Sequence, residues 1–193
     1  SPPEAKAVKT AARLPDIGKL AVPEHILSKP GPLTQEEFQK IRVHPQVGAE
    51  IISAVPFPYP VAPLILSHHE RWDGKGYPQG LKGEEIPLGA RILSVVDYYD
   101  ALTSDRPYHK AMTPEAALAL LQQEAGRALD PAVVQMFVKM AAEMEAAAGT
   151  IATAGTSTMT GPSRSRAGRT ERQSLVARSA RPRERGGTAA PRE

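Results

Sequence analysis

The chain has 193 residues, a length that suits one domain. Its apolar content of 41% is enough for a buried core, and abundant Ala and Leu with few aromatic residues favour helices. It contains no cysteine, which excludes disulfides, thiolate metal sites and cysteine nucleophiles, so His, Asp and Glu must hold any metal. No apolar run is long enough to cross a bilayer and no signal-peptide pattern is present, so we expect a cytoplasmic protein.

The net charge of +3 is unevenly distributed. Residues 161–193 hold nine Arg and three Glu, a net charge of +6, whereas residues 1–160 carry a net charge of −3. A basic tail can contact nucleic acid or a membrane surface, but this composition is more commonly a solvated, disordered end. We therefore expect a mildly acidic domain over residues 1–148, a disordered Arg-rich tail over 149–193, and no specific nucleic-acid partner.

The first quarter of the chain predicts a helix, then a loop, and then the start of a second helix. Residues 1–14 predict a helix that Pro15 interrupts. Pro and Gly over residues 26–33 predict a loop. Thr34 followed by Glu37 matches a capping box, which predicts that a helix begins here.

The middle of the chain predicts two more helices and a long loop. The helix that begins at Thr34 should end near His44, because Pro45 disfavours helical geometry in the residue before it. Residues 46–55 and 61–70 carry apolar side chains at helical spacing. Residues 71–87 contain four glycines and two prolines, and a loop of this length inside a domain is commonly functional.

The last part of the domain predicts three helices. Residues 88–103 present one apolar face. Thr-Pro at 113–114 and Asp-Pro at 130–131 are typical helix starts, for helices that run to about Gly126 and Ala148. No segment predicts a strand, so we expect an all-α fold.

Several side chains suit a metal site. Three histidines fall close to predicted helix ends: His44, His68 and His69. Adjacent helical residues point about 100° apart, so the pair could address two metals or two faces of one site. Asp97 is a carboxylate in an otherwise apolar helix, where a metal is one possible partner. Asp16 and Lys19 share one helical face.

Each of these residues also has a purely structural explanation. A His near a helix C-terminus complements the helix dipole. Asp97 could be an ion-paired surface residue, and Asp16 a carboxylate in the first turn of its helix. Four or five such groups would each need a separate explanation, so together they favour a metal site.

Three segments, in order, resemble the HD-GYP family: DIGKLAVPEHILSKPGPLT, HHERWDGKGYPQGLKGEEIPLGARI and VVDYYDALTSDRPY. Gly76, Tyr77 and Pro78 match the motif that names the family. The similarity covers roughly residues 11–140. The resemblance implies an HD-superfamily helical bundle with two or three divalent ions, often Fe or Mn, that hydrolyses cyclic-di-GMP to linear pGpG or GMP.

The resemblance also implies a role for each matched residue. Asp16 would bridge two metals, and Lys19 would contact substrate phosphate or the attacking hydroxide. The further metal ligands would be His44, His68, His69 and Asp97. The contacts to the dinucleotide phosphates would come from Arg106 and Lys110. The loop containing Gly76, Tyr77 and Pro78 would shape one side of the pocket and could bind signalling proteins such as a diguanylate cyclase.

The sequence departs from the family at three points. The HD pair reads Pro15-Asp16, and proline has no ligating atom; inside a helix it would also cost about 3 kcal/mol, so the helix should break there. Only 14 residues precede Pro15, whereas active family members carry at least one further helix. We therefore expect an N-terminally incomplete domain with fewer ions and with uncovered apolar surface that favours a homodimer. His109 stands where the family usually has Arg.

Three hypotheses about function follow. The first is a metal-dependent phosphodiesterase for cyclic-di-GMP or a related dinucleotide, with activity impaired by Pro15. The second is a degenerate module that still binds the dinucleotide or a signalling protein without turnover. The third is a decayed chain with no function, which the Arg-rich tail would fit.

Overall fold

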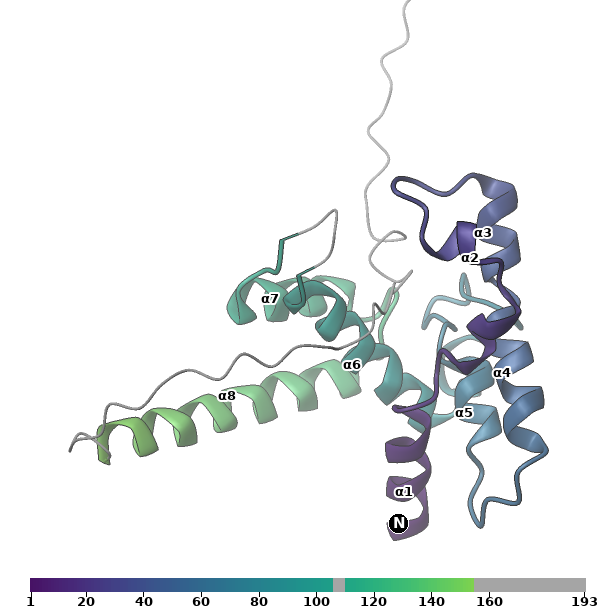
Figure 1. The fold of residues 1–193 in the computed structure, drawn as a ribbon. Coiled ribbons are helices and arrows are strands. Elements are labelled where there is room, and N and C mark those ends of the chain that lie inside the picture. The colour runs from purple at the N-terminus through teal and green to yellow at the C-terminus, as the bar shows by residue number, and fades with distance from the viewer. Residues whose placement is uncertain (106–109, 155–193) are drawn as a thin grey trace, which may run out of the picture.

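The computed structural model describes residues 1–105 and 110–154. These residues form helices and connecting loops and contain no β-strand, so the predicted all-α class is confirmed (Figure 1). The elements in chain order are α1 Pro2–Ala11, the 3-10 helix η1 Ile17–Ala21, α2 Glu24–Leu27, α3 Gln35–Ile41, α4 His44–Ser53, α5 Ala62–Ser67, the 3-10 helix η2 Gly83–Glu85, α6 Leu88–Thr103, α7 Pro114–Glu124 and α8 Pro131–Ala154. No helix within this described part is long and apolar enough to cross a membrane.

Two apolar clusters share α6. One joins α1, α4 and α5 to the first half of α6, where Leu93 is buried. The other joins the second half of α6 to α7 and the start of α8, through Val95, Tyr98 and Leu102. A smaller cluster lies under α2 and α3. Burial of these side chains stabilises the fold by roughly 1.5–3 kcal/mol for each large apolar residue. The far end of α8 extends away from the other helices (Figure 1).

The predicted helix starts are present. The Glu37 amide donates to Thr34 Oγ1 at 3.2 Å, and the Thr34 amide donates to Glu37 Oε2 at 2.7 Å, which completes the capping box. Thr113 Oγ1 accepts from the Ala116 amide at the start of α7. Asp130 Oδ1 accepts from the Ala132 amide at 2.8 Å at the start of α8. Side-chain oxygens thus satisfy amide groups that have no partner inside the helix.

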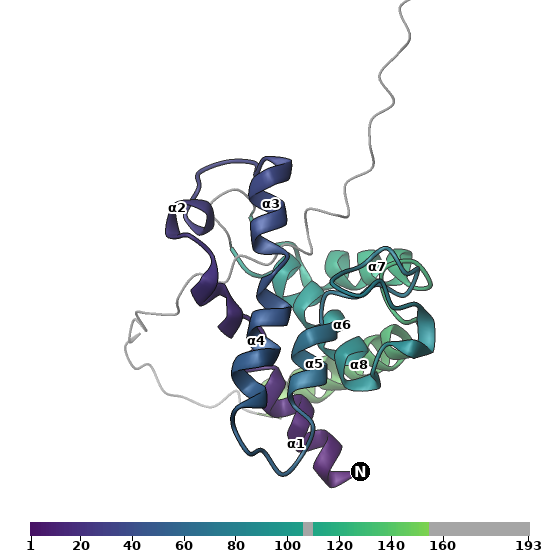
Figure 2. The ribbon, with the colours of Figure 1, turned by 90° about the vertical axis from the view of Figure 1, so that its right-hand side faces the viewer.

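Two predicted boundaries near the histidines are wrong. His44 does not end a helix: α3 ends at Ile41, and His44 begins α4 with Pro45 in its first turn. Proline is tolerated there because its missing N–H needs no partner in the first turn. The helix predicted over 61–70 is α5, which lies beside α4 (Figure 2). It ends at Ser67, so the two adjacent histidines lie just beyond it.

Two other boundaries also differ. The predicted loop over residues 26–33 begins inside the short helix α2. The last helix continues past Ala148 to Ala154, so residues 149–154, which we assigned to the tail, are helical. The remaining residues of the predicted disordered tail, 155–193, lie outside the described residues.

The chain changes direction at Pro15, as expected. Helix α1 ends at Ala11, a turn carries the backbone past Pro15, and η1 follows. The Leu14 amide donates to the Ala11 carbonyl, and the Ile17 amide donates to the Leu14 carbonyl, each at 3.1 Å. The turn thus avoids an interior helical position for a residue that has no N–H.

Candidate metal centre

Three histidines converge from two helices. His44 comes from the first residue of α4, and His68 and His69 directly follow α5. Each has a possible ligand nitrogen within 4.8 Å of those of the other two. All three are buried, with exposed fractions of 0%, 5% and 8%. Packing of α4 against α5 brings these residues together although they are far apart in the sequence.

The imidazoles of His44 and His68 are oriented by backbone carbonyls. His44 Nδ1 lies 2.7 Å from the Ile41 carbonyl oxygen, and His68 Nδ1 contacts the Ile65 carbonyl oxygen. A carbonyl only accepts, so Nδ1 must carry the hydrogen and Nε2 presents its lone pair. Ser94 Oγ donates to the His68 carbonyl at 2.8 Å, which ties the backbone at His68 to α6.

The Nε2 atoms of the cluster form no hydrogen bond with the described residues. His44 Nε2, His68 Nε2 and His69 Nε2 are buried, and no described residue hydrogen-bonds to them. Unpaired buried acceptors are costly in a folded protein. Neutral imidazole nitrogens, oriented through their second nitrogen, are the form in which His binds metals. The donor set therefore fits a divalent transition-metal ion.

Burial keeps these histidines neutral. Burial first, and repulsion from His68 second, lower the pKa of His44 to about 4. Burial also lowers the pKa of His68, and it lowers that of His69 well below the usual value, with added repulsion from His68 and His44. A charged imidazole loses its hydration in this environment, so the neutral, ligating form is favoured at neutral pH.

Asp16 and Lys19 lie at the open side of the cluster. Lys19 Nζ is 2.9 Å from Asp16 Oδ2, and Asp16 Oδ1 is 3.6 Å from His44 Nε2. The three-residue spacing seen in the sequence therefore corresponds to a direct ion pair on η1. Asp16 is not among the residues whose ligand atoms all lie within 4.8 Å, but its carboxylate contacts the edge of that set.

Gly18 permits the close approach of η1 to α4. A Cβ at this position would lie 1.9 Å from the His44 carbonyl oxygen and 2.6 Å from the Gly48 amide nitrogen. Any side chain would therefore push η1, with Asp16 and Lys19, away from His44. Pro15 lies half-buried directly before Asp16 and offers no ligating atom.

The loop after His69 is anchored by Glu70. Its buried carboxylate accepts hydrogen bonds from the backbone amides of Gln79, Gly80 and Leu81, at 2.6, 3.1 and 3.1 Å. The sequence analysis did not single out Glu70. The only available signal was a carboxylate next to a glycine-rich loop, because the amide groups it binds are brought together by the path of the loop.

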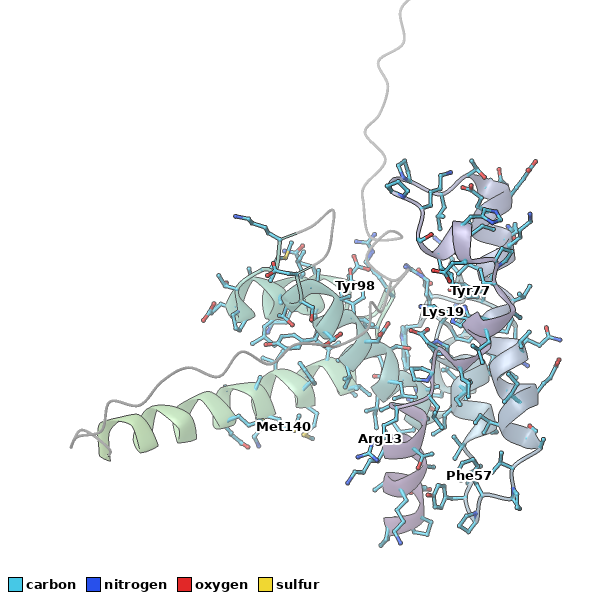
Figure 3. The ribbon with its side chains drawn as sticks, in the orientation of Figure 1. Arg13, Lys19, Phe57, Tyr77, Tyr98 and Met140 are labelled. Atoms are coloured by element: carbon cyan, nitrogen blue, oxygen red, sulfur yellow. The ribbon has the colours of Figure 1, made fainter. Side chains whose placement is uncertain are left out.

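Tyr77, which belongs to this loop, packs against His69. Its ring stacks on His69, with centroids 4.9 Å apart and planes 24° apart, and its amide donates to the His69 carbonyl at 3.2 Å. Gly76 allows this turn, because a Cβ there would lie 2.4 Å from the Arg71 amide nitrogen. Figure 3 shows Tyr77 and Lys19 on the half of the molecule that holds α4 and α5, away from α8.

The other residues predicted for the site are more dispersed. Asp97 on α6 is half-buried. Burial of Tyr77 is the main cause that raises the pKa of its hydroxyl, and the negative charges of Asp16 and Asp97 raise it as well. Asp97 is not in the histidine set. Pro78 is exposed, and Lys110 is exposed in the segment before α7. Arg106 and His109 lie outside the described residues.

A groove begins at Asp16 and Lys19. Its volume is about 650 Å³, within the range of small-molecule sites. The groove is lined by Arg13, Leu14, Asp16, Ile17, Lys19, Leu20, Val22, Glu24 and Leu27. The groove shares Asp16 and Lys19 with the candidate centre, but none of the three histidines lines it.

Residues 1–133, which contain all of this centre, match the HD domain family. The chain belongs to the HD domain family. It is 45% identical over 153 residues to the cyclic di-GMP phosphodiesterase response regulator RpfG of Xanthomonas campestris, a match that covers 78% of this chain and 40% of that protein. It is 36% identical over 138 residues to the 3'3'-cGAMP-specific phosphodiesterase 2 of Vibrio cholerae, covering 70% of this chain and 26% of that protein.

A solved structure supports the fold of this HD domain. A cyclic GMP-AMP-specific phosphodiesterase of V. cholerae superimposes with a TM-score of 0.56 at 20% identity, covering 73% of this chain and 39% of the other. The chain thus spans well under half the length of the relatives it matches. The HD-GYP family recognised in the sequence is confirmed by these findings, and the HD-superfamily helical bundle is confirmed as its fold.

Proposed function

We propose that this HD domain is a metal-dependent phosphodiesterase that hydrolyses cyclic-di-GMP to pGpG or GMP. The observation that carries the proposal is the set of three buried His Nε2 atoms that form no hydrogen bond with the described residues, next to the Asp16–Lys19 pair. The relatives named as cyclic di-GMP phosphodiesterases support this substrate. Relatives named as specific for 3'3'-cGAMP make that dinucleotide the alternative to be tested.

The residues divide into ligands and substrate contacts. The proposed metal ligands are His44, His68, His69, Asp16 and Asp97. A divalent ion held there supplies positive charge to phosphodiester oxygens and acidifies water at neutral pH. Lys19 adds a positive charge that does not compete for metal. The proposed substrate contacts are Arg106, Lys110, Gly76, Tyr77 and Pro78.

Pro15 is proposed to impair turnover. It stands where the family has the His of the HD pair, and it leaves the Asp16 side of the centre without a nitrogen donor. The ligands that remain suit fewer than the two or three Fe or Mn ions of the family. This difference favours a second candidate function, a module that binds a cyclic dinucleotide, or a diguanylate cyclase or other signalling protein through its Gly76–Pro78 loop.

Two further expectations belong to this proposal. A homodimer and a cytoplasmic location stay predictions. Size-exclusion chromatography with light scattering measures the first directly, and localisation of a tagged chain measures the second.

The test is anaerobic incubation with cyclic-di-GMP or 3'3'-cGAMP and with Fe(II) or Mn(II), with products followed by chromatography. Pro15→His is assayed alongside, and bound metal per chain is measured for both proteins. We expect slow or absent turnover in the native chain, and more bound metal and faster turnover in Pro15→His. Equal turnover in the two proteins would contradict the impairment. No turnover and no bound metal in either would contradict the phosphodiesterase itself.

A further inference from the structure

Arg42 lies beside the metal centre but is not among the proposed metal ligands or substrate contacts. It caps the C-terminus of α3, where its amide donates to the Phe38 carbonyl at 3.0 Å, and it precedes His44 by two residues. Its guanidinium carbon lies 4.9 Å from the centre of the Tyr77 ring. The same ring stacks on His69. One aromatic side chain therefore contacts both a half-buried cation and a candidate metal ligand.

The half-buried arginines of this chain differ in their partners. Arg71 pairs with Asp73 at 2.8 Å, and Arg91 pairs with Asp130 at 2.7 Å. For Arg42, no carboxylate lies within ion-pair distance among the residues whose side chains the structure describes, and its guanidinium lies over the Tyr77 ring. A cation removed from water is stabilised by an anion, so Arg42 has the features of a binding residue whose anion arrives with a ligand.

The cation–π contact leaves the donors of Arg42 available. A cation–π contact uses none of the N–H donors of the guanidinium, and no described residue accepts a hydrogen bond from the Arg42 side chain. Those groups match the oxygens of a phosphate in a two-pronged arrangement. The Tyr77 ring therefore fixes the position of Arg42 without using the hydrogen bonds through which it would recognise an anion.

The charges around the centre indicate which anion fits. The histidines are neutral ligands, and Lys19, the cation of η1, is already paired with Asp16. A cyclic dinucleotide carries two phosphodiester groups, so a phosphate contact beyond the metal itself requires another cation close by. Arg42 enters from the α3–α4 turn, whereas Lys19 enters from η1, so the two come from different elements that both adjoin His44.

We infer that Arg42 is a phosphate-binding residue of the substrate site, held in place by Tyr77. The inference rests on the proposed function for the identity of the ligand, a cyclic dinucleotide. It adds a contact that neither the family motifs nor the positions matched from the sequence include.

The test compares binding by the full chain and three variants, all loaded with Mn(II). Arg42→Gln removes the charge, and Arg42→Lys keeps it without the planar fork. Lys40→Gln removes the same charge from an exposed position two residues earlier on α3. Dissociation constants for cyclic-di-GMP and for pyrophosphate are measured by calorimetry at several salt concentrations, with metal content and melting temperature checked for each protein.

We expect Arg42→Gln to weaken binding of both probes by about 10- to 100-fold, as for loss of hydrogen bonds to a charged group. Its affinity should also depend less steeply on salt, because one charge contact is gone. Arg42→Lys should recover part of the loss, and Lys40→Gln should stay within about twofold of the native chain. A merely structural role for Arg42 would change the melting temperature but not the salt dependence.

The outcomes separate this inference from the proposed function. Native binding of cyclic-di-GMP that Arg42→Gln leaves unchanged overturns the inference alone. Binding of pyrophosphate through Arg42 without binding of cyclic-di-GMP supports the phosphate site and overturns the proposed substrate. If the native chain binds neither probe, both are overturned.

Discussion

The two sides of the metal centre are built differently. On the histidine side, His44, His68 and His69 are at most 8% exposed, and backbone carbonyls fix two of the rings. On the other side, the Asp16 side chain is 26% exposed, and it contacts Lys19 and the edge of His44. The family departure at Pro15 falls on this second side. The helices α4 and α5 therefore preorganise the nitrogen ligands independently of the residue that has changed.

The histidine side also has an energetic consequence for the metal-free protein. Each buried nitrogen without a partner destabilises the fold by about 1–3 kcal/mol. Three such atoms lie together here. A bound ion would satisfy them at once, so metal binding should stabilise the chain as well as equip it for chemistry.

The largest effect is expected where the two sides touch, at Gly18. Gly18→Ala would place a Cβ 1.9 Å from the His44 carbonyl oxygen, a contact that only movement of the backbone can relieve. We expect the free energy of unfolding to fall by more than about 4 kcal/mol, a large part of the stability of an ordinary domain. Urea unfolding followed by circular dichroism measures this loss.

Gly48→Ala is the matched control for that experiment. Its Cβ would lie 3.1 Å from a methyl group of Ile65 and 3.3 Å from the Gly18 amide nitrogen, a mild crowding that small shifts can relieve. Ala is also the better helix former within α4. We expect a change of less than about 2 kcal/mol. Equal losses in the two variants would show that the clash with the His44 carbonyl oxygen costs no more than the mild crowding at Gly48, and would contradict the special role of Gly18.

The sequence predicts the parts of this molecule that depend on local chemistry. The caps at Thr34 and Thr113 were predicted because a side chain and an amide three residues apart are enough to define them. The break at Pro15 follows from its missing N–H. His44 was misplaced because Pro45 is equally compatible with the end of one helix and the first turn of another, and local rules do not decide between them.

The parts that sequence reasoning missed depend on tertiary contacts. Glu70 binds amides nine to eleven residues away, so its role exists only once the loop has folded back. Arg42 stands out only when Tyr77 is seen against it. The candidate histidines were found because their residue type points to metal chemistry at any position, but their convergence within 4.8 Å required the packing of α4 on α5.

Acid should destabilise the metal-free chain through its buried histidines. Burial lowers the pKa of His44 from 6.5 to about 4, so the unfolded chain takes up a proton before the folded one does. The stability that the folded chain gains from keeping His44 neutral is fully present above pH 6.5, and it is lost as the pH falls from 6.5 towards 4. The difference corresponds to about 3 kcal/mol.

Urea unfolding midpoints in the presence of chelator, between pH 7.5 and 4.5, measure this effect. His44→Gln is the comparison, because it removes the titrating group and keeps a polar side chain of similar size. We expect the midpoint of the native chain to fall more steeply with acid than that of the variant. Parallel curves would mean that His44 is protonated as readily in the folded chain as in the unfolded one.

The smallest effect is expected on the open side of the centre. Asp16→Asn keeps the shape and one oxygen donor but removes the charge that pairs with Lys19, so we expect Mn(II) affinity to fall by about tenfold. His68→Gln, which removes a buried ligand oriented by Ile65, should cost at least about 100-fold. Competitive titration against a metal-binding dye gives both values. If Asp16→Asn lost more affinity than His68→Gln, the ion would be held mainly from the Pro15–Asp16 side, and preorganisation by α4 and α5 would not explain metal binding.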